Sequence, residues 1–159
     1  MHAPSKGFTL VEVMVTVVVA GIIAAIALPS LSSWYDRARA DSEIRKIQDV
    51  LKFARNQAFS YGAIVEVCPN NNSDCGTDWS KGILVRFQNS KEILKVIDSF
   101  NKNDALKVGS NNIAFRSDGL ADAATTFVYC PNNKSSGSKS LSLSSTGLIK
   151  TADDDLSCQ

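Results

Sequence analysis

The chain has 159 residues, 17 of them basic and 16 acidic, and its formal charge of +1 gives no global reason to expect nucleic acid as a partner. This length is enough for one modest domain plus an anchor. The only histidine, His2, precedes the main apolar run, so the chain beyond it lacks the base of a Ser-His-Asp or Cys-His catalytic site.

The first predicted element is an apolar run of 21 residues, Phe8–Leu28. As a helix rising ~1.5 Å per residue it covers roughly 32 Å, which matches a hydrocarbon core of ~30 Å. A secretory signal has a shorter apolar region followed by a small-x-small cleavage site, and none follows cleanly here. We therefore expect a membrane span. The unusual residue is Glu12, because a carboxylate inside lipid is costly and normally has a partner.

Pro29 follows the span and is expected to kink the helix rather than end it, because the helical pattern resumes beyond it. Apolar residues then recur at steps of mostly three and four, while charged residues fill the other faces. This pattern predicts one long helix, from about Phe8 to Phe59, whose second half packs against the domain that follows. The apolar stripe comprises Leu31, Trp34, Ala38, Ile44, Ile47, Leu51, Ala54, Ala58 and Tyr61.

Beyond Tyr61 the hydrophobic period changes to that of β-strands. Short runs with turn signals between them predict antiparallel sheets, because no alternation of strands with helices is present. The expected fold class is therefore α+β: a long N-terminal helix packed on an antiparallel β-rich domain. The strand-like segments are 63–69, 82–88, 92–100, 112–121, 125–131 and 139–151.

Four cysteines, Cys68, Cys75, Cys130 and Cys158, all follow the apolar run. Their even number favours disulfides in an oxidising compartment over four reduced thiols, and their spacing matches no zinc site. Three pairings are possible. We favour Cys68–Cys75, which closes a loop rich in turn formers, together with Cys130–Cys158, which tethers the tail to a strand end. Basic residues flank both ends of the span, so orientation rests on the cysteines, which favour an exported C-terminal part.

The string "KGFTLVEVMV", residues 6–15, resembles the processing site of type IV pilins and type II secretion pseudopilins. The resemblance implies a leader, residues 1–7, removed by a prepilin peptidase that cuts after Gly7. It also implies methylation of the new amine of Phe8, and a role for Glu12 in assembly opposite the N-terminal amine of a neighbouring subunit. Snorkelling of Glu12 to the headgroups is the alternative.

The resemblance predicts four segments. These are the leader 1–7, a membrane and filament-core helix 8–28 that ends before the Pro29 kink, an amphipathic half 29–61, and a disulfide-containing β-domain 62–159. The strings "FRSDGLA", residues 115–121, and "SLSLSSTGLIKT", residues 140–151, loosely resemble the terminal hairpins of the pseudopilin H and FimT/FimU minor-pilin group. Four cysteines fit FimU-like minor pilins better than simple pseudopilin H proteins, which often lack such disulfides.

The implied function is that of a minor type IV pilin, a structural subunit that helps prime pilus assembly, sits at the pilus tip and serves twitching motility. Its implied partners are other minor pilins, the major pilin, the prepilin peptidase and the inner-membrane assembly platform. The implied location is the bacterial inner membrane, as a single-pass protein with a periplasmic C-terminal domain, and then the pilus or pseudopilus. No cofactor or metal is expected.

Three alternatives remain open. The chain could be a pseudopilin H, assembled with other pseudopilins in a type II secretion machine. A DNA-binding pilin is less favoured, because the chain beyond Tyr61 contains ten basic and eleven acidic residues and so has no excess of positive charge to bind phosphates. A membrane-anchored enzyme has no support from a histidine, a metal-ligand spacing or a phosphate-binding loop.

Overall fold

The computed structural model describes residues 7–152 and 155–158, without the side chains of residues 27–30 and 152. The chain divides into two compact units, Met1–Tyr35 and Asp36–Gln159. A single helix, α1 (Leu10–Tyr61), contributes to both units. Each of its ends lies two residues further along the chain than in the predicted Phe8–Phe59.

In the first unit, every described side chain of α1 is exposed. The helix passes through Pro29 without a break in its assigned span. The side chain of Pro29 lies outside the described ones, and the kink at this position stays a prediction.

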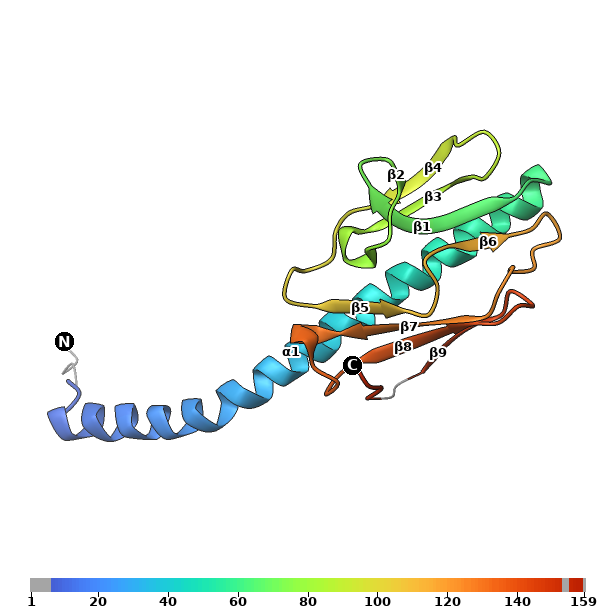
Figure 1. Ribbon diagram of the computed structural model, residues 1–159. Helices are drawn as coiled ribbons and strands as arrows, with labels where there is room; N and C mark the ends of the chain where they lie inside the picture. Colours follow the sequence, from blue (N-terminus) through green and yellow to red (C-terminus); the bar gives the residue numbers. More distant parts are fainter. Residues whose placement is uncertain (1–6, 153–154, 159) are drawn as a thin grey trace, which may run out of the picture. The chain divides into compact units, whose positions relative to one another are not determined.

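The second unit places the rest of α1 beside two antiparallel sheets (Figure 1). In the first sheet the strand order is β2-β1-β3-β4, with β6 also paired to β1, and in the second it is β5-β7-β8-β9. Two short 3₁₀ turns, η1 (Trp79–Lys81) and η2 (Pro131–Asn133), lie in the connections. The strands are β1 (Val65–Asn71), β2 (Asp74–Cys75), β3 (Ile83–Phe87), β4 (Ile93–Ile97), β5 (Ala105–Val108), β6 (Ile113–Phe115), β7 (Thr125–Cys130), β8 (Lys139–Leu143) and β9 (Ile149–Ala152).

The core forms where the apolar stripe of α1 meets the inward faces of both sheets. The buried stripe runs through Ala40, Ile44, Ile47, Leu51, Ala54 and Ala58, with Val50 beside it. From the sheets, the fully buried side chains include Val65, Val67, Phe115, Phe127, Tyr129, Leu141 and Leu143. Burial of this apolar surface is the dominant favourable contribution to folding.

The predicted stripe was correct in its centre and wrong at its ends. Leu31, Trp34, Ala38 and Tyr61 are exposed, and Ala40 is buried instead of Ala38. Two residues correspond to about 200° around a helix, so Ala38 lies almost opposite the stripe on which Ala40 lies. The α+β fold class is confirmed, whereas β2 and β5 were not predicted.

Candidate functional site

Thr9 caps the N-terminus of α1, a role that the sequence analysis did not single out. Its Oγ1 accepts a hydrogen bond from the backbone N–H of Glu12 at 3.2 Å, and its carbonyl accepts from Val13 N at 3.2 Å. Thr9 is therefore the N-cap, and Glu12 occupies the third helical position, as in the Thr-x-x-Glu capping pattern. A carboxylate in the first turn is also favoured by the positive end of the helix dipole.

Gly7 and Phe8 directly precede this cap, in a segment without regular structure, and both are exposed. A Cβ added to Gly7 would meet no atom within 4 Å. The fold itself therefore gives no steric reason for glycine at this position. The structure thus brings Gly7, Phe8 and Glu12 together at one end of α1, while residues 1–6 of the predicted leader lie outside the described residues.

The apolar helix beyond Glu12 has the length and composition needed to cross a membrane. Residues 13–35 contain no charged side chain. The large apolar side chains of this stretch are exposed, including Met14, Val18 and Ile22. Such a surface needs an apolar environment, either lipid or other helices.

Both pairs of cysteines form disulfides. Cys68 bonds to Cys75 and Cys130 bonds to Cys158, with Cα–Cα distances of 5.4 and 6.1 Å. These are the pairings that the sequence favoured. The first bond closes the loop between β1 and β2, and the second ties the C-terminal tail to the end of β7.

A buried polar cluster joins α1 to the second sheet. The Asp104 side chain is fully buried, with Oδ2 2.9 Å from Arg39 Nε and Oδ1 accepting from Arg39 Nη2 at 2.9 Å. The Tyr129 hydroxyl donates to Asp104 at 2.5 Å, and Asn132 N donates at 2.8 Å. Burial raises the pKa of the Tyr129 phenol, and the hydrogen bond to Asp104 acts in the same direction. Every Asp104 oxygen is therefore satisfied without solvent.

A second cluster lies on the outer face of the first sheet. Glu66 and Arg86 are paired across β1 and β3 and form a buried ion pair. Arg86 also donates to Asp74 at 2.6 Å, and Lys91 donates to Glu66 at 3.1 Å. Burial acts to raise the pKa of Glu66, but the hydrogen bonds from Arg86 and Lys91 outweigh it and hold the pKa below its usual value. Because Asp74 lies within the Cys68–Cys75 loop, this cluster fastens that loop to the sheet.

Two turns of the β-domain meet at one helix residue, Arg55. Its Nε donates to the carbonyl of Gly119 at 2.9 Å. A Cβ placed on Gly147 would lie 2.5 Å from that carbonyl and 2.9 Å from Arg55 Nε, and Gly147 has φ +76°. The two terminal hairpins singled out in the sequence are thus held side by side on α1.

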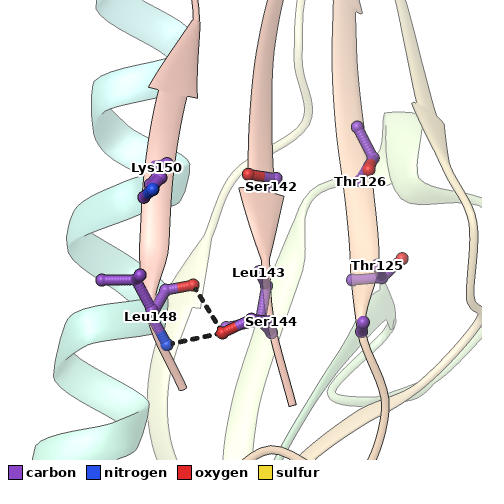
Figure 2. A pocket seen from close by; sticks show the side chains of 8 residues that line it. Thr125, Thr126, Ser142, Leu143, Ser144, Leu148 and Lys150 are labelled. Carbon is purple, nitrogen blue, oxygen red and sulfur yellow. Dashed lines mark hydrogen bonds between the residues drawn. The ribbon is translucent and has the colours of Figure 1, made fainter. Parts of the chain in front are cut away.

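A shallow pocket of about 410 Å³ opens on the second sheet (Figure 2). Thr126, Ser142 and Lys150 are register neighbours across β7, β8 and β9 and are exposed. Ser144 Oγ accepts from the N–H of Leu148 at 3.1 Å, which closes the β8–β9 turn. The lining side chains include no carboxylate and no imidazole to serve as a general acid or base. Among the described residues no group of three or more His, Cys, Asp or Glu could hold a metal ion.

Comparison with known families gives two matches. The family model of the type II transport protein GspH matches residues 43–147, and that of the prokaryotic N-terminal methylation motif matches residues 3–28. The first covers more than half of the chain and includes the last part of α1, from Glu43 to Tyr61, with most of the β-domain.

Curated relatives include a fimbrial protein of Neisseria meningitidis serogroup B, 29% identical over 93 residues, which are 58% of this chain and 52% of the relative. The type II secretion system core protein G of Pseudomonas aeruginosa is 40% identical over 59 residues, 35% of this chain and 42% of the relative. The chain thus spans about half the length of the first of these curated relatives.

Among solved structures, the type IV minor pilin FimU of Pseudomonas aeruginosa has the same fold. A crystal structure of it matches with a TM-score of 0.66 and 23% sequence identity, covering 79% of this chain and 99% of that chain. At this identity the likeness concerns the fold.

Proposed function

The chain belongs to the GspH family of type II transport proteins within the type IV pilin and pseudopilin superfamily, and from this premise we propose that it is a minor type IV pilin. Members of this superfamily are structural subunits rather than enzymes. In this role the chain helps to prime filament assembly and occupies the pilus tip, where it serves twitching motility.

The observation that carries the proposal is the exposed Gly7-Phe8 junction followed by a capped helix with Glu12 in its first turn. Since no packing requirement explains Gly7, selection by a prepilin peptidase that rejects a Cβ accounts for it. Cleavage removes the leader 1–7 and leaves Phe8 with a positive amine, which is then methylated. The cap holds Glu12 in place about one helical turn beyond that amine.

Glu12 then has a partner in the amine of a neighbouring subunit. An ionised carboxylate within the membrane costs at least ~2.5–3.5 kcal/mol on insertion scales, and pairing offsets that cost. The pair also sets the axial register between subunits. Residues 8–28 form the membrane span and later the filament core, the Pro29 kink follows, residues 29–61 form the amphipathic half, and residues 62–159 form the periplasmic domain.

Two disulfides support a periplasmic, oxidising location for the β-domain. The implied partners are other minor pilins, the major pilin, the prepilin peptidase and the inner-membrane assembly platform. The two disulfides favour a FimU-like minor pilin over a simple pseudopilin H.

A second candidate is pseudopilin H of a type II secretion system, which the GspH family match and the likeness to core protein G favour. DNA binding for uptake has less support, because the basic residues of the β-domain do not outnumber the acidic ones.

The test is to shear surface filaments from cells that carry the wild-type chain, Glu12→Gln or Glu12→Asp, and to measure the chain in the filament fraction. We expect the wild type in the filaments, a loss of at least tenfold for Glu12→Gln, and partial retention for Glu12→Asp, which keeps the charge. Normal incorporation of Glu12→Gln would contradict the role of Glu12. Intact pili together with lost protein secretion in a deletion strain would instead favour the pseudopilin.

A further inference from the structure

The uncharged part of α1 ends in two aromatic residues. After Glu12 the next charged residues are Asp36 and Arg37, and Trp34 and Tyr35 lie immediately before them. Between Phe8 and Phe53 they are the only aromatic residues. Apolar sequence, an aromatic pair and then charge is the order in which a helix leaves a bilayer.

The length of the helix places this pair at a defined depth. A hydrocarbon core of ~30 Å takes about 20 helical residues, so a span that begins with the helix at Leu10 ends near residue 30. The headgroup layer adds roughly 5–7 Å on each side, which is another three to five residues. Trp34 therefore falls within the headgroup layer on the far side of the membrane from Glu12. Arg37 lies just beyond that layer.

The surroundings of Trp34 differ from those of the chain's other tryptophan. The Trp79 side chain is 5% exposed, and its indole N–H donates to Ser110 O at 3.0 Å. Trp34 is 65% exposed, and within the described part of the chain its indole N–H has no protein acceptor. A large apolar ring with a free N–H donor suits a layer in which hydrocarbon and polar headgroups meet.

We propose that Trp34, assisted by Tyr35, binds the periplasmic headgroup layer of the lipid bilayer and sets the depth of the chain before assembly. This inference rests on the proposed membrane span, with its hydrocarbon part counted from Leu10, where α1 begins. When the subunit leaves the membrane for a filament, Trp34 exchanges lipid for protein. Its fluorescence therefore distinguishes the membrane form from the assembled form.

The test uses the full chain reconstituted in phosphatidylethanolamine–phosphatidylglycerol vesicles. The vesicles contain phospholipids brominated either near the carbonyl or near the end of the acyl chain, and tryptophan quenching is measured in each. The Trp34→Phe variant gives the background from Trp79. In that background, Leu31→Trp and Ala38→Trp place the indole about one helical turn to either side, and both positions are exposed.

We expect Trp34 to be quenched at least twofold more by shallow than by deep bromines. The Leu31→Trp variant should show stronger quenching by deep bromines than Trp34 does, and the Ala38→Trp variant should show little quenching by either. Absence of Trp34 quenching in a chain that floats with the vesicles would overturn the inference while leaving the span intact. Strongest quenching by deep bromines would place Trp34 in the hydrocarbon and would also overturn the inference. Failure of the chain to float with the vesicles would instead contradict the proposed span.

Discussion

Arg39 Nε lies 2.9 Å from Asp104 Oδ2, in an ion pair that joins the long helix to the segment before β5. The Arg39 side chain is 18% exposed and the Asp104 side chain is fully buried. This contact spans 65 residues of sequence and, with Tyr129 and Asn132, fixes the helix to the second sheet.

Replacing Asp104 with asparagine is expected to destabilise the folded chain by about 3–5 kcal/mol, because the substitution leaves Arg39 as a largely buried charge without its partner. The free energy of unfolding can be measured by denaturant titration of the full chain in detergent. The control is Asp41→Asn, which breaks an exposed helix pair with Arg45 at 2.9 Å and should cost less than about 0.5 kcal/mol. An equal loss of unfolding free energy in the two variants would show that the buried pair contributes no more to stability than the exposed pair.

Stability should also fall at alkaline pH through Tyr129. Because burial and Asp104 raise the pKa of its phenol in the folded state, the neutral form is favoured there. The corresponding stability is complete below the unfolded pKa of about 10 and is lost as the pH rises beyond it. Tyr129→Phe should lower stability at neutral pH by about 1–3 kcal/mol and flatten the alkaline decline. Exposed Tyr61→Phe is the control, and a decline unchanged by Tyr129→Phe would assign it to other groups.

The two disulfides should contribute unequally. Their sequence separations are 28 for Cys130–Cys158 and 7 for Cys68–Cys75. In the chain-entropy account, replacing both cysteines of the longer loop by serine costs about 3–4 kcal/mol, and the same change in the shorter loop costs about 2–3 kcal/mol. Denaturant titration of the two double variants measures the difference. The reverse order would show that the contact of Asp74 with Arg86 outweighs loop length.

Gly147 should tolerate alanine poorly. The added Cβ would meet Gly119 O at 2.5 Å and Arg55 Nε at 2.9 Å, and φ is +76°. We expect a loss of about 2–4 kcal/mol from combined strain and overpacking. Gly62→Ala is the matched control, since φ is +59° but no atom lies within 4 Å, and it should cost about 1–2 kcal/mol. Thermal unfolding of the two variants compares them, and similar losses would mean that the close approach of the two turns is unimportant.

The helix and most strands could be predicted because each has a hydrophobic period of its own. The stripe from Ile44 to Ala58 is a clear example. β5 escaped prediction because "ALKV" is short and its burial depends on pairing with distant β7. The Asp104 cluster could not be predicted either, because Arg39 lies in α1, Asp104 in the connection before β5 and Tyr129 in β7, and no local pattern links them.

At the N-terminus the string Lys-Gly-Phe-Thr-Leu-Val-Glu marked the candidate site directly, since its residues are consecutive. Even there the cap formed by Thr9 was missed, although Thr-x-x-Glu at the start of an apolar run is its usual signal. The cap explains how Glu12 is held in place near the proposed new chain end.

The proposal that this chain is a processed filament subunit is tested most directly by mass spectrometry of its N-terminal peptide after extraction from membranes. The account predicts a chain that begins at Phe8 and carries one methyl group on its amine. A chain that retains Met1, or one that begins after Ala20 or Ala27, would contradict it.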